Sequence, residues 1–387
     1  MKSRIPFLLL VSLVLLSPSS AAKVTEHIAL TVAGFDIPIV VVVPDSPSER
    51  SPVIYHVHGG GWNGGTETTV PDASVPAGLR LLTDELGIIH VGLAYRGKVQ
   101  GDFFDALQDI RDSISWFEAR ADEFGADLSR VGFSGGSAGT TLSSRLAQEY
   151  PACHTYIGLY GVYDLLNNPE SLFPDTEARA DFGLATETTQ RAASAYYHLR
   201  ANPPATLLFH GEQDILTHRS QSIRFAEKLR QQGASAEVII HPEVNHGFFS
   251  ERYPAVFKTT LTRIAQWYVE YQGVDAGALP SLESAIDRRV AGYFPQDEIE
   301  PAALLGSWKD KHDTYTFADD ANGTWTDRQG RAVSFRFDIQ DSAIKLKYPT
   351  GETTLYLQQN GRALYVITAH NPRRNGQRFN YPKQTAP

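Results

Sequence analysis

Apolar residues between positions 53 and 271 follow two patterns that alternate along the chain. Residues 53–57 and 88–94 are short continuous apolar runs, which are typical of strands buried on both faces. From Phe103 to Phe117 the apolar positions recur at spacings of four and three, which predicts one stripe of an amphipathic helix. Repeated alternation of strand and helix predicts an α/β fold with a mainly parallel, doubly wound sheet. The same patterns predict further strands at 130–134, 155–160, 206–210 and 236–241, and helices at 77–86, 138–150, 219–232 and 254–271.

Two segments that depart from this alternation belong to the same predicted domain, which covers residues 23–273. Between 24 and 43, two strand-like stretches flank Gly34. Between 163 and 203 the alternation stops, and aromatic, proline and acidic residues are frequent. An insertion at the carboxyl end of a strand in an open parallel sheet lies beside the ligand crevice, which predicts a small cap. An ordinary pair of surface helices is the alternative.

The period of the pattern changes after residue 273. Residues 274–302 are rich in Ala, Gly, Pro and acidic residues, which predicts a linker with one short helix. From Val333 to Ile339 every second residue is apolar, and further short runs of this kind predict a separate, small antiparallel β-domain over residues 303–387. Asn322-Gly323 and Asn360-Gly361 lie between such runs and are predicted to be hairpin turns.

Residues 1–22 have the order of charge, apolar core and small residues that is typical of a secretory signal peptide. Lys2 and Arg4 precede an apolar run, and small residues lead to a predicted cleavage site between Ala22 and Lys23. We therefore expect an exported protein, secreted or periplasmic, with no membrane insertion after cleavage. A retained membrane anchor is the alternative.

Charge and cysteine content narrow the possible partners. The formal net charge of the 387 residues is −9, and loss of residues 1–22 leaves 33 basic and 44 acidic residues. An acidic surface disfavours nucleic acid and anionic membrane as partners. Cys153 is the only cysteine, so no intrachain disulfide can form, and we predict that it is a small buried apolar residue.

The strongest chemical signal is a G-x-S-x-G element at residues 135–139, after a predicted strand and before a predicted helix. Small residues permit the sharp turn that exposes a nucleophilic serine in this position, which makes Ser137 the candidate nucleophile. Residues 132–136 match the same pattern around Ser134, but Ser134 is needed within the strand. The alternative without catalysis is a Gly-rich turn whose serine caps the helix.

A second Gly-rich loop follows the strand at 53–57. Exposed main-chain N–H groups can stabilise the negative charge that develops on a carbonyl oxygen, provided that no side chain blocks the approach. Gly60 and Gly61, together with the N–H of Ala138, are the predicted oxyanion hole. We predict that His58 and Gly59 support the loop and that His58 does not transfer protons.

The predicted acid and base follow the serine in the order Ser, Asp, His. Asp214 comes after the strand at 206–210, and His246 comes after the strand at 236–241, so both are expected at the carboxyl edge of the sheet. His246 would take the proton from Ser137, and Asp214 would orient the imidazole. The remaining alternatives are Glu212 for the acid and His210, His218 or His241 for the base.

No metal site is expected. The chain has no H-E-x-x-H sequence and no paired Cys/His spacing, and residues 320–323 lack the ligands of a calcium loop.

These motifs together resemble the α/β-hydrolase carboxylesterases with an HGGG loop, close to hormone-sensitive-lipase-like and bacterial feruloyl- and acetylxylan-esterase-like proteins. The resemblance spans residues 37–271. It rests on HGGGW at 58–62, Tyr95-Arg96, the segment from Asp127 to Arg130 that leads into the next strand, GGSAG at 135–139, HGEQD at 210–214 and NHGF at 245–248. It implies ester hydrolysis through an acyl-enzyme on Ser137, without a cofactor. Thr140 stands where such proteins often have a glycine, which concerns helix packing more than chemistry. The carboxy-terminal domain resembles a small lipocalin-like β-domain.

The expected function is hydrolysis of a small-molecule or carbohydrate ester, such as an acetyl or feruloyl ester. A peptidase or amidase, including a formamidase, could use the same three residues. A glycan- or envelope-binding protein with a vestigial hydrolase domain is the alternative without catalysis. Glycan contact would involve the β-domain, where Tyr315 and Trp325 could stack on sugar rings, although core packing is the favoured role for both.

Overall fold

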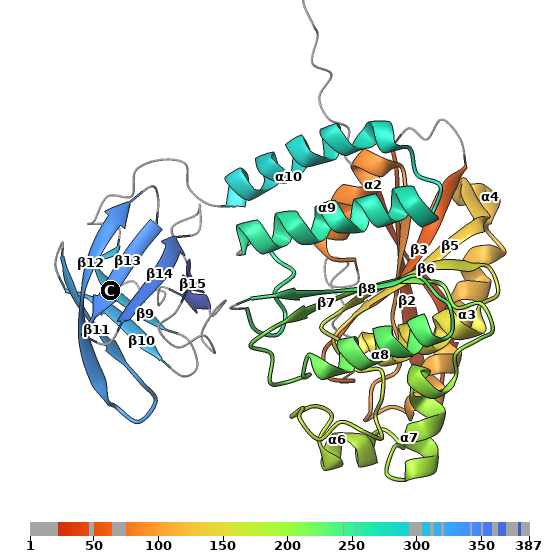
Figure 1. The fold of residues 1–387 in the computed structure, drawn as a ribbon, viewed down its shortest axis with the longest axis horizontal. Helices are drawn as coiled ribbons and strands as arrows, with labels where there is room; N and C mark the ends of the chain where they lie inside the picture. The colour runs from red at the N-terminus through yellow and green to blue at the C-terminus, as the bar shows by residue number, and fades with distance from the viewer. Residues whose placement is uncertain are drawn as a thin grey trace, which may run out of the picture.

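The computed structural model describes two folded regions, an α/β region of residues 22–293 and a β-barrel of residues 304–380 (Figure 1). The described residues are 22–45, 50–63, 75–242, 244–251, 253–293, 304–309, 313–318, 321–340, 343–349, 351–357, 363–368 and 378–380. Apart from Ala22, the predicted signal peptide lies outside them. Within the described ranges, no helix is both long enough and apolar enough to cross a membrane.

An eight-stranded sheet forms the centre of the first region, in the order β1-β2-β4-β3-β5-β6-β7-β8. The pairs that involve β2 are antiparallel, and all pairs from β4 to β8 are parallel. The predicted α/β fold with a mainly parallel sheet is therefore confirmed. The strands are β1 (Lys23–Val32), β2 (Phe35–Val43), β3 (Ser51–Val57), β4 (Ile89–Leu93), β5 (Ala126–Gly136), β6 (Cys153–Leu159), β7 (Ala205–Gly211) and β8 (Ala236–His241).

Helices cover both faces of this sheet (Figure 1). Helices α3, α5 and α8 pack on one face and α2, α9 and α10 lie on the other, as the two apolar clusters between sheet and helices show. The helices are α2 (Ala77–Leu86), α3 (Phe103–Glu118), α4 (Ala121–Phe124), α5 (Gly139–Glu149), α6 (Thr176–Asp181), α7 (Glu187–Ala193), α8 (Ser220–Gln231), α9 (Pro254–Tyr271) and α10 (Leu279–Tyr293), with short 3₁₀ turns at Ala195–Tyr197 and Ala276–Ala278.

The helix boundaries follow local sequence signals. The side chain of Asp102 accepts hydrogen bonds from the first turn of α3, and the side chain of Asp105 accepts one from the main-chain N–H of Asp102, which is a capping box. Helix α2 ends at Gly87, whose φ of 67° is a left-handed conformation that glycine adopts without steric cost. These signals explain why α3 begins and α2 ends at the predicted residues.

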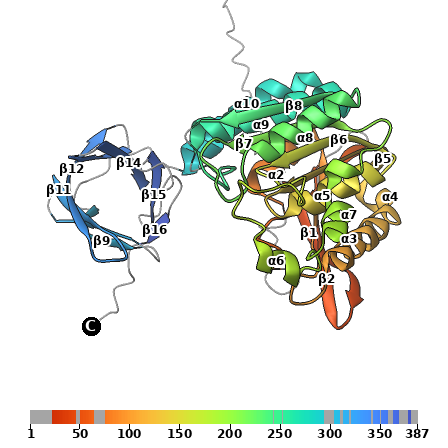
Figure 2. The ribbon, with the colours of Figure 1, turned by 60° about the horizontal axis from the view of Figure 1, so that its bottom comes forward.

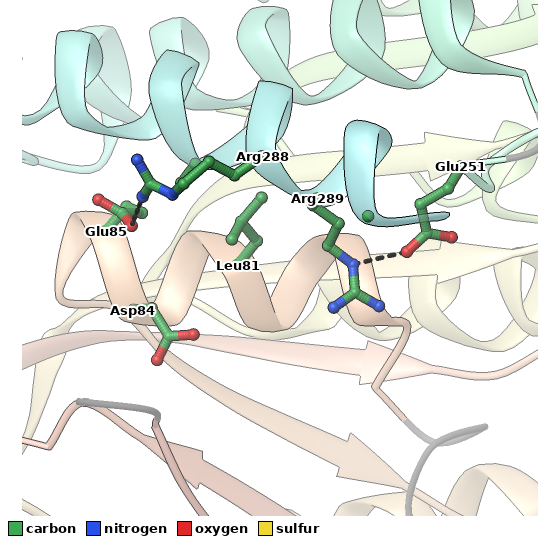
Figure 3. A pocket seen from close by; sticks show the side chains of 8 residues that line it. Leu81, Asp84, Glu85, Glu251, Arg288 and Arg289 are labelled. Atoms are coloured by element: carbon green, nitrogen blue, oxygen red, sulfur yellow. Dashed lines mark hydrogen bonds and ion pairs between the residues drawn. The ribbon is translucent and has the colours of Figure 1, made fainter. Parts of the chain in front are cut away.

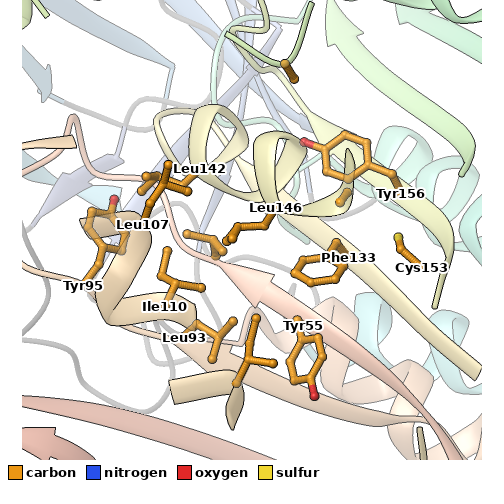
Figure 4. Close-up of a cluster of buried hydrophobic side chains, with 14 of the residues drawn as sticks. Tyr55, Leu93, Tyr95, Leu107, Ile110, Phe133, Leu142, Leu146, Cys153 and Tyr156 are labelled. Carbon is orange, nitrogen blue, oxygen red and sulfur yellow. The ribbon is translucent and has the colours of Figure 1, made fainter. Parts of the chain in front are cut away.

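The core on the α3–α5–α8 face is built from aromatic and aliphatic side chains of the central strands and of α3 and α5 (Figure 4). Tyr55 and Phe133 come from neighbouring strands and their rings lie 5.2 Å apart. Cys153 lies in the same cluster, and burial raises the pKa of its thiol to about 12. The prediction that Cys153 is a small buried apolar residue is therefore confirmed.

The segment predicted as a linker with one short helix is different in the structure. It holds the 15-residue helix α10, which packs on α2 and α9 and belongs to the α/β region. Leu282 and Ile286 are buried in that contact, because apolar residues recur along α10 at helical spacing, at Leu279, Leu282, Ile286 and Val290. A hollow of about 400 Å³ beside α2 and α10 is lined by charged pairs, with Arg289 2.6 Å from Glu251 and Arg288 3.9 Å from Glu85 (Figure 3).

The second region is a closed antiparallel barrel of eight short strands in the order β10-β11-β12-β13-β14-β15-β16-β9. It lies beside the α/β region in both ribbon views (Figures 1 and 2). The predicted separate antiparallel β-domain is confirmed. The strands are β9 (Gly306–Lys309), β10 (Thr314–Phe317), β11 (Asn322–Thr326), β12 (Ala332–Gln340), β13 (Ala343–Tyr348), β14 (Gly351–Leu357), β15 (Ala363–Thr368) and β16 (Arg378–Asn380).

Two local predictions for the barrel are corrected or narrowed. Asn322 and Gly323 are the first residues of β11, not a hairpin turn, because Gly323 pairs with Phe317 of β10 and with Phe335 of β12. A side chain at Gly323 would collide with Phe335, which explains the glycine. The predicted turn at Asn360-Gly361 lies outside the described residues. Tyr315 and Trp325 are buried in the barrel core, so they are not available for stacking on a sugar.

Candidate active site

Ser137 occupies a strained turn between β5 and α5. Its φ of 52° is in the left-handed region, which side chains adopt rarely, and the residue is partly exposed. Its main-chain N–H donates to Leu159 O at 2.9 Å, which ties the turn to β6. A Cβ at Gly139 would lie 2.3 Å from Val57 O, so only glycine allows α5 to begin this close to β3. The glycines of the G-x-S-x-G element therefore have the steric role that the sequence predicts for them.

The structure brings Ser137, His246 and Asp214 into one chain of contacts. His246 Nε2 lies 2.7 Å from Ser137 Oγ, and His246 Nδ1 lies 2.7 Å from Asp214 Oδ2. Because an ionised carboxylate only accepts hydrogen bonds, Nδ1–H donates to Asp214 and Nε2 is left to accept from the serine hydroxyl. This is the tautomer in which a histidine can take the proton of a serine.

Asp214 is held as an anion in a buried position. Only 1 % of its surface is exposed, and its Oδ1 accepts from the main-chain N–H groups of Leu216 at 2.9 Å and Thr217 at 3.0 Å. Burial by itself raises the pKa of this carboxyl, but contacts with His210 and His246 outweigh burial and hold the pKa well below its usual range. Asp214 is therefore ionised at neutral pH.

Three residues around the acid and base were not predicted to have this role. Thr217 Oγ1 lies 3.1 Å from Asp214 Oδ2 and 3.2 Å from His246 Nδ1, and it donates to Tyr160 O at 2.9 Å. His210 Nε2 lies 3.4 Å from Asp214 Oδ2 and 2.6 Å from Thr217 O. The spacing of Asp214 and Thr217 by three residues is a local turn signal that could have indicated Thr217. The ring of Tyr160 packs on that of His246. Tyr160 has no local signal of this kind, because the two residues follow different strands, β6 and β8.

The rival residues lie in other environments. Ser134 is fully buried within β5 and contacts His56 Nδ1 at 2.8 Å. Glu212 is exposed, and its N–H donates to His241 O. His241 lies 2.9 Å from Thr260 Oγ1, and its pKa is lowered to about 4 by burial. None of these three has a contact with Ser137 or His246 among the described residues. His218 contacts Ser220 and Glu170 at the start of α8.

The Gly-rich loop packs directly against the serine turn. A Cβ at Gly59 would lie 2.8 Å from Gly136 O and 3.0 Å from Ser137 Cβ. Gly60 and Gly61 have φ values of 104° and 66°, which favour glycine. The described residues supply no hydrogen-bond acceptor to the main-chain N–H of Gly60, Gly61 or Ala138. These donors are therefore available to a ligand near Ser137.

Side chains on both sides hold the loop in place. His58 is buried, its ring stacks on that of Tyr95 with centroids 4.8 Å apart, and burial lowers its pKa. Trp62 is fully buried despite a φ of 60°, and its Nε1 lies 3.2 Å from both Ala138 O and Thr141 Oγ1. The loop is thus fixed to the first turn of α5.

The segment predicted as a cap contacts both loops of the site. The rings of Phe173 and Phe182 lie 4.8 and 5.0 Å from that of Trp62. The N–H groups of Leu172 and Phe173 donate to the carbonyl groups of Ile215 and Leu216, next to Asp214. These contacts link the segment to the Gly-rich loop and to the loop of Asp214, and the cap itself stays a prediction.

Among the described residues, no group of three or more His, Cys, Asp or Glu side chains is arranged to hold a metal ion.

The α/β region is similar to known proteins in sequence and in fold. The family model described as BD-FAE matches residues 39–229. The matched residues lie in the α/β region of residues 22–293, which we call the hydrolase domain. The hydrolase domain is similar to carboxylesterase NlhH of Mycobacterium tuberculosis, with 27% identity over 254 residues that cover 58% of this chain and 76% of NlhH. It is also similar to the probable carboxylic ester hydrolase LipM of the same organism, with 25% identity over 50% of this chain.

Solved structures show the same fold. Esterase 2 of Thermogutta terrifontis with bound propionate aligns with a TM-score of 0.53 and 24% identity, over 66% of this chain and 96% of that structure. The chain spans 48% of LipM and 52% of esterase LipQ, about half the length of each. The predicted resemblance to α/β-hydrolase carboxylesterases is confirmed.

Proposed function

We propose that this protein is a serine carboxylesterase that cleaves its substrate through an acyl-enzyme on Ser137. One observation carries the proposal: His246 lies within 2.7 Å of both Ser137 Oγ and Asp214 Oδ2, in an α/β-hydrolase sheet. The names of the related proteins support ester bonds as the target.

The proposed reaction begins at Ser137 Oγ, which attacks the ester carbonyl carbon as His246 Nε2 takes its proton. The imidazolium that forms is stabilised by the buried carboxylate of Asp214. His246 then gives the proton to the leaving alcohol, and the acyl group remains on Ser137 as an ester. Water attacks this ester with His246 again as base, which releases the acid and restores the hydroxyl.

The main-chain N–H groups of Gly60, Gly61 and Ala138 are the proposed oxyanion hole. They belong to two segments in contact, since a Cβ at Gly59 would touch Ser137. Ala138 precedes the first residue of α5, where the helix dipole favours a negative charge. His58 and Gly59 hold this loop, and burial keeps His58 neutral and outside the proton transfer.

We propose esters of carbohydrates, with acetyl or feruloyl acyl groups, as the substrate class. The amino-terminal signal-peptide pattern supports action outside the cytoplasm, where such esters occur as polymers. The excess of acidic residues supports a neutral or sugar-linked ester over an anionic partner.

A burst assay with short-chain nitrophenyl esters tests the reaction. The wild-type protein should release about one equivalent of nitrophenol rapidly if acylation is faster than deacylation. Ser137→Ala should abolish both burst and turnover, whereas Ser134→Ala, which leaves the three catalytic residues intact, should retain both. Turnover that survives Ser137→Ala would refute the proposal.

An ester panel tests the substrate class. Acetate, butyrate, octanoate and ferulate esters, together with acetylated xylan, separate acyl preference from the need for a sugar. Higher kcat/KM for sugar-linked acetate or ferulate than for matched alkyl esters supports the proposal. The opposite ranking would assign small alkyl or aryl esters instead. Fractionation of the native host with sequencing of the mature amino terminus tests export and cleavage after Ala22.

A further inference from the structure

Tyr160 follows β6 directly and has an unusual backbone conformation. Its φ is 41°, which is unfavourable for a large side chain. The other described non-glycine residues with positive φ are Ala33 in the β1–β2 turn and Trp62 and Ser137 at the site. Strain of this kind persists where the surrounding structure enforces it, and it concentrates at functional sites.

Hydrogen bonds on both sides of the residue enforce this conformation. The N–H of Tyr160 donates to Phe209 O at 2.7 Å, and its carbonyl accepts from Thr217 Oγ1 at 2.9 Å. The same hydroxyl of Thr217 lies 3.2 Å from His246 Nδ1. The main chain of Tyr160 is therefore joined to the acid and base through one buried threonine.

The ring of Tyr160 packs on the imidazole of His246. The two ring centroids lie 4.9 Å apart in a T-shaped arrangement, and the ring of Phe248 lies 5.1 Å from Tyr160 on another side. On the serine side, a Cβ at Gly136 would lie 3.6 Å from the ring and 3.6 Å from the hydroxyl oxygen of Tyr160. The ring thus contacts the imidazole and lies close to the residue that precedes Ser137.

This position distinguishes Tyr160 from the aromatic residues of the core. It is partly exposed, whereas Tyr55, Tyr156 and Tyr163 are almost completely buried. Burial of apolar surface alone would not require a left-handed backbone at this position. A ring packed against the imidazole restricts its rotation away from Ser137 and excludes water from one of its sides.

We propose that Tyr160 is a positioning residue that holds the imidazole of His246 between Asp214 and Ser137. The proposal rests on the function proposed above, in which His246 moves the proton of Ser137. Tyr160 acts through His246 and takes no proton itself.

Three substitutions distinguish the effect of the aromatic ring of Tyr160 from the effects of its hydroxyl group and of its backbone conformation. Tyr160→Phe keeps the ring, Tyr160→Leu removes it but keeps bulk, and Tyr160→Gly removes it in a residue that adopts positive φ without strain. Tyr196→Leu is the matched control, because Tyr196 is a half-buried tyrosine that packs on Tyr197. Melting curves identify the folded variants, and either Tyr160→Leu or Tyr160→Gly suffices for the comparison.

The readouts are kcat and KM for a short nitrophenyl ester and the low-field proton NMR signal of the His246 Nδ1–H that donates to Asp214. Tyr160→Phe and Tyr196→Leu should stay within about threefold of wild-type kcat, and loss of the ring should lower kcat about 10- to 100-fold with little change in KM. The low-field signal should broaden or vanish only when the ring is removed.

Two results would overturn the proposal. One is wild-type kcat and an unchanged low-field signal without the ring; the other is a rise in KM at unchanged kcat, which would make Tyr160 a substrate contact. If the wild-type protein shows no turnover that depends on Ser137, the proposed function fails. The NMR comparison still decides whether Tyr160 positions His246.

Discussion

The open sheet of the hydrolase domain and the closed barrel differ in where they place polar groups and strained backbone. The hydrolase domain buries ionisable side chains such as Asp109, Asp214 and His56, and it has positive φ at large residues such as Trp62. In the described part of the barrel, the buried polar residues are Asp313 and Thr353, and positive φ occurs only at glycines. Buried charge and backbone strain therefore gather in the region that carries the candidate chemistry.

The topology of the two sheets explains this difference. In the open sheet, β5, β7 and β8 run parallel, so the loops after them meet at one edge and bring Ser137, Asp214 and His246 together. The barrel closes on itself, and its interior is filled by side chains such as Trp308, Phe335 and Leu346. The comparison predicts that damage to the Gly-rich loop affects catalysis, whereas damage to the barrel affects only stability.

The largest expected effect is that of Gly59→Ala. A methyl group there would lie 2.8 Å from Gly136 O and 3.0 Å from Ser137 Cβ, so the loop must shift away from the serine. We expect kcat/KM for a short ester to fall by about 10²-fold or more, with little change in melting temperature. Gly292→Ala in α10 is the control, because nothing lies within 4 Å of its added methyl group and activity should not change. Normal activity in Gly59→Ala would show that the position of the Gly-rich loop does not matter for catalysis.

The next largest effect is expected on the stability of the barrel. Trp308 is fully buried there, and Trp308→Ala should destabilise the barrel by about 3–5 kcal/mol. Calorimetry should show a lower transition for the barrel, while kcat of the soluble protein stays at the wild-type value. Lys309→Ala, one residue along β9 on the exposed face, should change neither quantity. A loss of kcat in Trp308→Ala would contradict the division of roles between the two regions.

Acid should destabilise the hydrolase domain through its buried histidines. Burial lowers the pKa of His56 and of His90 to about 3, whereas both titrate near 6.5 when unfolded. Between about pH 6.5 and pH 3 the unfolded chain binds more protons, so stability falls as the pH drops through this window. Each histidine should contribute a slope of up to about 1.4 kcal/mol per pH unit.

Urea unfolding at several pH values measures this slope. His90→Gln should make the loss of stability with acid shallower, even if it lowers stability at pH 8, where Thr83 Oγ1 loses its contact with His90 Nδ1. The described strands of the barrel contain no histidine, so these strands add no buried histidine of this kind to the barrel transition. An unchanged slope in His90→Gln would show that other groups cause the acid sensitivity.

The smallest expected effect concerns the outer surface of the barrel. Arg336 of β12 lies directly opposite Lys347 of β13, both are exposed, and like charges in such pairs destabilise a sheet. Arg336→Glu should therefore raise the stability of the barrel by about 0.2–1 kcal/mol without changing kcat. Combining it with Lys347→Glu restores two like charges, and the gain measured by calorimetry should disappear.

Local signals were sufficient for most helices and for the candidate residues. Helix α9 starts at Pro254 as predicted, because proline is favoured in the first turn, and α2 ends before Gly87 for the reason given above. The linker prediction was wrong, because a composition rich in Ala and Gly does not reveal that α10 can bury Leu282 and Ile286 against α2 and α9. Helical propensity is a local property, whereas that burial depends on a surface formed by distant parts of the chain.

The sequence by itself determined the α/β fold, the separate antiparallel domain and the candidate residues Ser137, Asp214 and His246, because apolar period and turn glycines act over a few neighbouring residues. Only the tertiary structure decided that Ser134 is buried in the core, that Thr217 contacts His246, and that Tyr160 packs on His246. These contacts join residues on different strands and loops, up to 109 positions apart for Ser137 and His246. They depend on strand order and on the packing of loops at one edge of the sheet, which no local pattern specifies.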